Sequence, residues 1–147
     1  MVIIRKMCRE DVDKVLDMMR TFYASPAVLH KASEEILKRD IKDCIGDLPF
    51  IEGFVFEDGG SIAGYSMIAK SYSTEYGCIC IWIEDLYIKP QYRGLGIGTQ
   101  FFSYIEKLYQ DNAVRFRLEV EKNNTKAIEM YKRCGYKELP YIEMTKE

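Results

Sequence analysis

The sequence predicts a mixed α/β fold of the α+β class, with a mostly antiparallel sheet and about four flanking helices. In the first part of the chain, two strand-like runs at 50–56 and 62–71 are separated by Asp58-Gly59-Gly60. Such residues form tight hairpin turns, because glycine accepts a positive φ. Further along, strand-like and helix-like patterns alternate, which is typical of parallel pairing. The expected order is β-α-α-β-β-β-α-β-α-β-β, so the sheet should be mixed.

Two amphipathic helices are expected after a first strand at residues 2–4. In the first helix Pro26 interrupts the pattern, and in the second Ser33 can cap the start while Gly46 and Pro49 end the helix. The apolar positions with helical spacing are Val12, Val15, Leu16, Met19, Phe22 and Tyr23, then Ile36, Leu37, Ile41, Cys44 and Ile45.

The second half of the chain begins with a long strand run at 77–88, which Pro90 closes. A glycine-rich segment then leads into a helix, and residues 115–121 alternate between polar and apolar as a strand does. Residues 124–134 have helical spacing and end at Gly135. We expect a final pair of short strands at 136–139 and 141–144.

Bulk properties favour one folded domain, residues 1–147. The chain has 147 residues, too few for two cores, and 48% hydrophobic residues. No apolar run approaches the ~20 residues of a membrane helix, and the first residues do not resemble a signal peptide. The net charge of −2 disfavours a nucleic-acid partner. We therefore expect a cytoplasmic protein that binds neither membrane nor nucleic acid.

Residues 93–98, Arg-Gly-Leu-Gly-Ile-Gly, lie between a strand and a helix and can form an anion site. Glycines allow consecutive backbone N–H groups to converge, and the helix adds its unpaired N–H donors. Arg93 can pair with a phosphate, and Thr99 offers a hydroxyl.

Other interpretations of this segment fit less well. A bare turn explains one glycine but seldom three in five residues, and a Walker loop needs Gly-Lys-Ser/Thr. Glu119 stands where the ribose-binding acid of a dinucleotide site would lie, but the glycines do not follow G-x-G-x-x-G.

Two motifs make the sequence resemble the GNAT acetyltransferase superfamily. Arg93, Gly96 and Gly98 match its Q/R-x-x-G-x-G/A motif. Further on, 124–136 matches N-x-x-A-x-x-x-Y-x-x-x-G-F/Y. The Glu84-Asp85 pair is similar to that of the spermidine/spermine branch.

The resemblance implies a sheet that opens beside its fourth strand, with acetyl-CoA as co-substrate in the gap. Backbone groups of Leu86 and Ile88 would bind the pantetheine arm like an added strand. Asn124 would contact that arm, and Tyr131 would lie near the sulfur. The residues that the resemblance assigns to acetyl-CoA are Leu86, Tyr87, Ile88, Arg93, Gly94, Leu95, Gly96, Ile97, Gly98, Thr99, Asn124, Ala127 and Tyr131.

Acetyl transfer from a thioester requires an amine that loses a proton, a donor for the carbonyl oxygen and a proton for the thiolate. Glu84 is the expected base, directly or through water, because burial in an apolar strand would raise its pKa. Strand side chains alternate, so Asp85 should face the other way, and it is a candidate for acceptor binding. Either acid could instead pair with a lysine. Tyr131 is the candidate proton donor, although its spacing also fits a core position.

The acceptor should be a small primary amine, such as a polyamine or an amino-acid-like metabolite. Candidate contacts besides Asp85 are Tyr23, His30 and Trp82, each of which could equally be structural. We expect direct attack in a ternary complex, since the sole histidine lies far in sequence from Cys134. Cys78 and Cys80 lack further ligands nearby, so no metal is expected. A peptide or protein N-acetyltransferase, and a non-catalytic acyl-CoA-binding module, are the alternatives; a homodimer is expected by analogy.

Overall fold

A five-stranded sheet forms the centre of the computed structural model, which describes residues 1–147 except the side chain of Val114. The strands lie in chain order: β1 (Val2–Lys6), β2 (Ile51–Asp58), β3 (Ser61–Ser73), β4 (Cys78–Ile88) and β5 (Ala113–Leu118). The first four pair antiparallel and β5 pairs parallel to β4. The predicted mixed sheet is thus confirmed.

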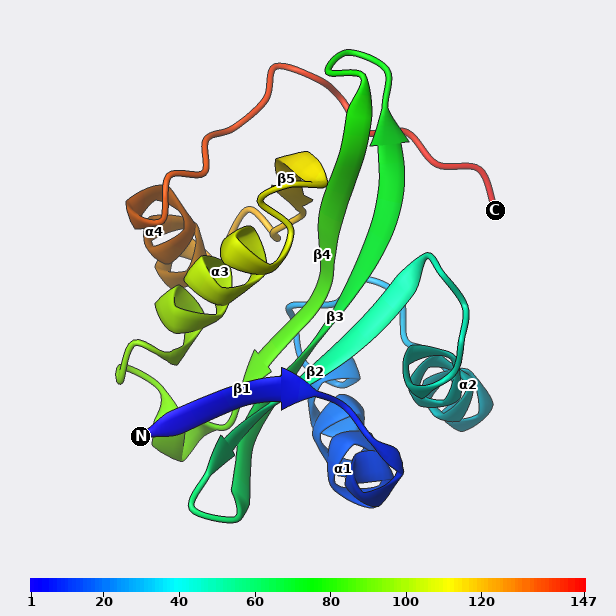
Figure 1. The fold of residues 1–147 in the computed structure, drawn as a ribbon, viewed down its shortest axis with the longest axis vertical. Helices are drawn as coiled ribbons and strands as arrows, with labels where there is room; N and C mark the ends of the chain where they lie inside the picture. Colours follow the sequence, from blue (N-terminus) through cyan, green and yellow to red (C-terminus); the bar gives the residue numbers. More distant parts are fainter.

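Helices cover both faces of the sheet (Figure 1). They are α1 (Val12–Tyr23) and α2 (Glu34–Ile45) on one face, and α3 (Ile97–Leu108) and α4 (Thr125–Arg133) on the other. Two short 3₁₀ turns, Arg9–Asp11 and Pro90–Tyr92, precede α1 and follow β4. Ser33 caps α2 as predicted, accepting a hydrogen bond from the backbone N–H of Ile36 at 3.3 Å. In the described part of the chain, no helix is long and apolar enough to cross a membrane.

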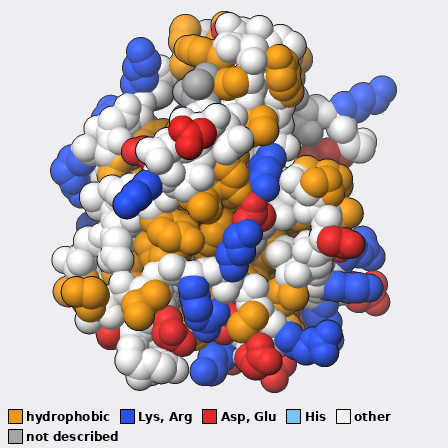
Figure 2. Space-filling view, in the orientation of Figure 1, with side chains coloured by type: hydrophobic (Ala, Val, Ile, Leu, Met, Phe, Trp, Pro, Cys, Tyr) orange, Lys and Arg blue, Asp and Glu red, His pale blue; other side chains and the backbone are white. Residues whose placement is uncertain are grey.

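Each face of the sheet has its own hydrophobic core. The core beneath α1 and α2 is formed by residues such as Leu16, Met19, Ile41, Val55 and Tyr65. The core beneath α3 includes Phe54, Phe56, Ile81, Phe101 and Ile105. In the space-filling view, apolar side chains gather between α3 and the strands, and most charged side chains lie around them (Figure 2). Alternate residues of the same strands therefore serve opposite cores.

A register shift interrupts β4 at Glu84. Ile83 is paired with Ile68 and Asp85 with Met67, so Glu84 is an extra residue. Ile83 packs in the α3 core, whereas Asp85 contacts tyrosines on the α1 face. In an unbroken strand, residues two apart would share a face. The bulge therefore exchanges the two faces for the rest of β4, and the simple alternation expected at Glu84 and Asp85 does not apply.

The sheet opens beside the second half of β4. The pairing of β4 with β5 ends at Ile83 and Leu118, although β4 continues to Ile88. The predicted opening at the fourth strand is present.

The two predicted C-terminal strands are wrong. After α4 the chain forms no strand among its described residues, and the tail runs past the end of the β3–β4 hairpin (Figure 1). There the hydroxyl of Tyr141 donates to Glu75 at 3.2 Å. Pro140, which lacks an N–H, divides two runs of only four residues, and such short runs form strands only where a sheet edge pairs with them.

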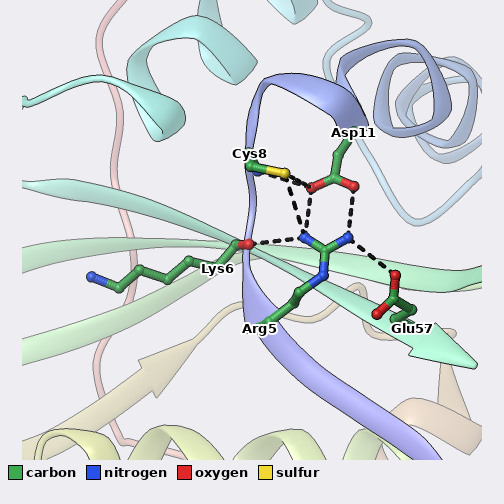
Figure 3. A network of polar contacts seen from close by, with 5 residues as sticks. All are labelled: Arg5, Lys6, Cys8, Asp11 and Glu57. Atoms are coloured by element: carbon green, nitrogen blue, oxygen red, sulfur yellow. Dashed lines mark hydrogen bonds and ion pairs between the residues drawn. The ribbon is translucent and has the colours of Figure 1, made fainter. Parts of the chain in front are cut away.

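A polar network fixes β1 to the start of α1 (Figure 3). Arg5 donates two hydrogen bonds to the carboxylate of Asp11, at 2.8 and 2.9 Å, and reaches Glu57 at 3.4 Å. The backbone N–H of Cys8 donates to the same carboxylate at 2.8 Å. The network thereby joins the edge strand, the connecting turn and β2.

Candidate active site

The glycine segment between β4 and α3 has the backbone geometry of an anion site. Gly94 and Gly96 adopt left-handed φ values of 78° and 80°, which disfavour other residues. A Cβ at either position would meet no atom within 4 Å, so the space above them is open. The segment is therefore shaped to let a ligand approach the backbone closely.

The start of α3 supplies donors to this open space. Gly96 is the N-cap, and the N–H of Gln100 makes the first helical hydrogen bond, to the carbonyl of Gly96 at 3.0 Å. The N–H groups of residues 97–99 precede that bond and have no helical acceptor. Such donors, at the positive end of a 12-residue helix, suit a phosphate. The residues present therefore fit the diphosphate of acetyl-CoA.

Arg93 lies along the end of β4. Its Nε donates to the carbonyl of Ile88 at 2.8 Å, and its guanidinium lies 5.7 Å from the ring centre of Tyr87. Among the described residues its terminal nitrogens have no hydrogen-bond partner, so they are available to an anion. The sequence placed Arg93 at the loop but did not predict its contact with β4.

The open edge of β4 presents the backbone N–H groups of Leu86 and Ile88, whereas the Ile88 carbonyl already accepts from Arg93. The N–H of Lys89 donates to Ala63 of β3 at 2.8 Å. Successive residues of a strand direct their N–H groups to opposite sides, so those of Leu86 and Ile88 face away from β3. β5 has already ended on that side. This edge can accept an extended, amide-containing ligand.

Three carboxylates gather where β4 and β5 separate: Glu84, Glu119 directly after β5, and Glu143 from the tail. Desolvation, and then repulsion from Glu143, raise the pKa of Glu84, although its side chain reaches solvent. Hydrogen bonding to Glu143, and then burial, raise the pKa of Glu119 to about 7. Sequence reasoning missed Glu119 and Glu143 at this place. The parallel pairing of β4 and β5 was the signal for Glu119, because the ends of parallel strands meet at one edge.

Asp85 is the buried acid of the Glu84-Asp85 pair, with 4% of its surface exposed. The hydroxyl of Tyr23 donates to Oδ1 and that of Tyr65 to Oδ2, each at 2.9 Å. Burial raises the pKa of Asp85 to about 6, and the two phenol hydrogen bonds oppose the rise. The structure brings Tyr23 and Asp85 together, as two predicted acceptor residues, and adds Tyr65.

Tyr131 and Asn124 carry polar groups without protein partners among the described residues. The Tyr131 ring packs edge-on against Phe102, 5.7 Å between centres, and burial raises the pKa of its phenol. Asn124 is the N-cap of α4, yet its side chain makes no cap hydrogen bond. Ala127, one turn before Tyr131, is half-buried. Tyr131 therefore packs as a core residue does, and it also has the unpaired hydroxyl that a proton donor needs.

The remaining predicted acceptor residues lie apart. The Trp82 ring is covered by the guanidinium of Arg117, 4.4 Å from its centre, and His30 is exposed in the loop between α1 and α2. A groove of about 350 Å³ beside this loop includes Tyr23 in its lining. Its lining residues are Arg20, Tyr23, Ala24, Lys31, Ala32, Glu34 and Leu37.

The sequence model of the acetyltransferase (GNAT) family matches residues 14–136. The chain belongs to the GNAT family. GNAT acetyltransferases use acetyl-CoA as co-substrate, and this chain is an acyl-CoA-dependent N-acetyltransferase. The predicted family and enzyme class are confirmed.

Relatives of this GNAT chain act on different amines. Thialysine N-epsilon-acetyltransferase of Sus scrofa is 33% identical over 153 residues, which cover 97% of this chain and 88% of that protein. The putative ribosomal protein bS18-alanine N-acetyltransferase of Bacillus subtilis is 30% identical over 133 residues, 90% of this chain and 78% of that protein.

Solved structures agree with the GNAT fold. A possible acetyltransferase of Clostridium difficile 630 superposes with a TM-score of 0.86 at 22% identity, covering 99% of this chain and 97% of that one. AAC(6')-Iy in complex with a CoA-containing bisubstrate analogue gives a TM-score of 0.83 at 12% identity, covering 100% and 98%. The predicted fold class is confirmed.

Proposed function

We propose that the enzyme acetylates the primary amine of a small, amino-acid-like acceptor by direct attack in a ternary complex with acetyl-CoA. The observation that carries the proposal is the contact between Tyr23, which lines the groove beside α1 and α2, and Asp85 of β4. It connects a surface groove to the strand beside the open gap. The thialysine N-epsilon-acetyltransferase relatives, about a third identical over nearly the whole chain, support an amine on an amino-acid side chain.

Acetyl-CoA would lie along the opening beside β4. The glycines and N–H groups from Arg93 to Thr99 would hold the diphosphate, and the edge of Leu86, Tyr87 and Ile88 would hold the pantetheine arm. Asn124, Ala127 and Tyr131 of α4 would line the other side. When bound, acetyl-CoA supplies the acetyl group as a reactive thioester.

Glu84 and Tyr131 would carry out the proton transfers of the reaction. Glu84 would take a proton from the attacking amine, directly or through a water, and its raised pKa makes it a better base. A β4 backbone N–H would stabilise the carbonyl oxygen. The Tyr131 hydroxyl, free of protein partners among the described residues, would protonate the departing thiolate.

The charges of the groove favour an acceptor that carries a carboxylate. Arg20 is paired with Glu34 and Asp17. Lys31 donates only to the backbone carbonyl of Ser25, at 2.9 Å, and forms no ion pair with a described residue. We propose that Lys31 binds the acceptor carboxylate, with His30 and Trp82 at the margins of the site.

The test is an acetyl-CoA assay that follows free CoA thiol with lysine, thialysine, cadaverine, spermidine and an alanine-initiated peptide. Cadaverine is lysine without its carboxylate, so a contact with Lys31 predicts a kcat/KM about 10-fold higher for lysine. The peptide as the best acceptor would favour an N-terminal acetyltransferase like the Bacillus subtilis relative. CoA binding without thiol release from any of these acceptors would contradict the proposed acceptor class.

We also propose a homodimer in the cytoplasm. Ile142 and Met144 of the tail are 90% and 92% exposed and would be available to contact the second copy. The five cysteines are unpaired in the described structure, as expected in a reducing compartment. Light scattering of the purified protein measures the oligomeric state, and cell fractionation the location.

A further inference from the structure

Asp85 of β4 is a buried carboxylate that accepts hydrogen bonds from two phenols, one of which lines the acceptor groove. Tyr23 comes from the end of α1, Tyr65 from β3 and Asp85 from β4, so three elements converge on one group. Each carboxylate oxygen accepts one phenolic hydrogen bond at 2.9 Å.

Asp85 carries its charge without a counter-ion. No lysine, arginine or histidine of the described chain lies within ion-pair distance of it. Its charged neighbours are the acids Asp40 of α2 and Glu84, and the Cys44 thiol of α2 also faces this region. A buried charge without a partner of opposite sign reduces stability. Packing alone therefore does not explain an acid at this position.

Asp85 is also poorly placed to meet an acceptor directly. It is 4% exposed, and the two phenol rings lie between its oxygens and the surroundings, so an ammonium in the groove reaches the Tyr23 hydroxyl before it reaches the carboxylate. Tyr23, by contrast, is half-buried and lines the groove. Its hydroxyl donates to Asp85, which leaves the lone pairs of its oxygen for another donor.

Building on the proposed function, we propose that Tyr23 contacts the acceptor amine and that Asp85, acting through Tyr23, receives the first proton the amine loses. As an ammonium proton moves to Tyr23 Oη, the Tyr23 hydroxyl proton moves to Asp85 Oδ1. The amine becomes a neutral nucleophile, Tyr23 remains a neutral phenol, and Asp85 becomes a neutral acid. Tyr65 holds the second oxygen and fixes the orientation of the carboxylate.

This assignment completes the proton balance of amide formation. An ammonium must lose two protons to become an amide nitrogen, one before attack and one after the N–C bond forms. The first passes through Tyr23 to Asp85, and the second goes to Glu84 while the C–S bond breaks and Tyr131 protonates the thiolate. Asp85 returns its proton to solvent along the same path, and the proton on Glu84 passes through solvent to the Tyr131 phenolate, so one proton is released for each amide formed. Burial raises the pKa of both Tyr23 and Tyr65, so both are phenols before and after the transfer.

The test compares Tyr23→Phe and Asp85→Asn with the control Tyr72→Phe, which removes a phenol from the exposed end of β3. With lysine, the first two variants should lose about 100-fold in kcat/KM, as expected for loss of an acid–base group. With a weakly basic amine that is already neutral at pH 7, each should lose less than about 10-fold, because no first proton has to be removed. Equal losses with both amines, or no loss with lysine, would overturn the relay.

A binding measurement keeps the proposal testable without turnover. Lysine titrated into the CoA complex should bind Tyr23→Phe about 10-fold more weakly than wild type, since one hydrogen bond from a charged group is lost. Unchanged affinity would overturn the contact.

Asp85→Asn should unfold at the same temperature as wild type or higher, because a buried amide costs less than a carboxylate; a lower unfolding temperature would indicate a structural role. Absence of acetylation by wild type would contradict the proposed function alone.

Discussion

Two adjacent carboxylates, Glu84 and Asp85, have different surroundings although they have nearly the same chemistry. Glu84 is the extra residue of the bulge and reaches solvent where β4 and β5 separate. Asp85 is enclosed between two phenols on the α1 side. Environments that differ in this way give neighbouring acids different roles in proton transfer.

Glu84→Gln should lower kcat about 100-fold, the usual contribution of a general base, and leave CoA affinity unchanged. A base works only when deprotonated, so activity should fall as the pH drops through the pKa of Glu84, which is raised above its ordinary value. The pH profile of kcat measures this acid limb; in the variant the contribution of Glu84 should be absent, and only the limb of Asp85, the other base of the proposed relay, should remain. Glu143→Gln should keep the plateau and move the limb to lower pH, because repulsion from Glu143 is removed. A limb that persists unchanged in Glu84→Gln would belong to another group.

Tyr131→Phe should slow transfer by about 10- to 100-fold, because it removes the proton donor and keeps the ring that packs on Phe102. Thermal unfolding should be unaffected. Tyr136→Phe is the matched control, since its hydroxyl is buried without a hydrogen-bond partner among the described residues. Its removal should raise stability and leave kcat as in wild type; equal rates in both variants and wild type would make Tyr131 a packing residue only.

At the scale of elements, two glycine variants distinguish the role of the loop before α3 in CoA binding from the general cost of replacing a left-handed glycine. Gly96 and Gly60 have similar φ values, 80° and 87°, and both face open space. Alanine at either position should cost about 1–2 kcal/mol of unfolding free energy, because both backbones are left-handed. Only Gly96→Ala should also weaken CoA binding, and Gly96→Glu should abolish it, since its side chain and charge would occupy the phosphate site. Calorimetric titration with CoA distinguishes the pair; equal affinities would place the diphosphate elsewhere.

Elements with strong local signals could be predicted from the sequence. The helices follow from apolar periodicity, and the β2–β3 hairpin from Asp58-Gly59-Gly60, because these signals act over a few residues. The bulge at Glu84 depends on how β3 and β4 align, which no local pattern specifies. The contacts of Asp85 join residues 62 and 20 positions apart, so its phenol partners could not be foreseen. The residues of the C-terminal tail have a strand-like pattern but do not pair with an edge of the sheet, and the sequence pattern alone does not show whether such an edge is near.

At the scale of the whole molecule, the network around Arg5 and Asp11 links the sheet edge to α1 (Figure 3). Hydrogen bonding from Arg5 lowers the pKa of Asp11 to about 2, against the effect of burial. A lowered pKa stabilises the fold above the ordinary value of ~3.9, and this stabilisation is lost as the pH falls toward 2.

Asp11→Asn should therefore lower the free energy of unfolding by about 2 kcal/mol at pH 7, with a difference from wild type that shrinks between pH 4 and 2. Urea unfolding across this range measures it. Asp17→Asn breaks an exposed ion pair with Arg20 and should change stability by less than about 0.5 kcal/mol. A difference for Asp11→Asn that stays constant with pH would show that the charge of Asp11 is not what stabilises the link.

The bulge in β4 also bears on how this protein can diverge. Deleting Glu84 would join Ile83 to Asp85 in regular alternation, so Asp85 and Tyr87 would stay on the α1 side and Leu86 and Ile88 on the α3 side. Both cores and the ligand edge would remain, and only the carboxylate that we propose as the base would be lost. Position 84 can therefore change or lose its residue, and with it the chemistry, without a change in the fold of the strand.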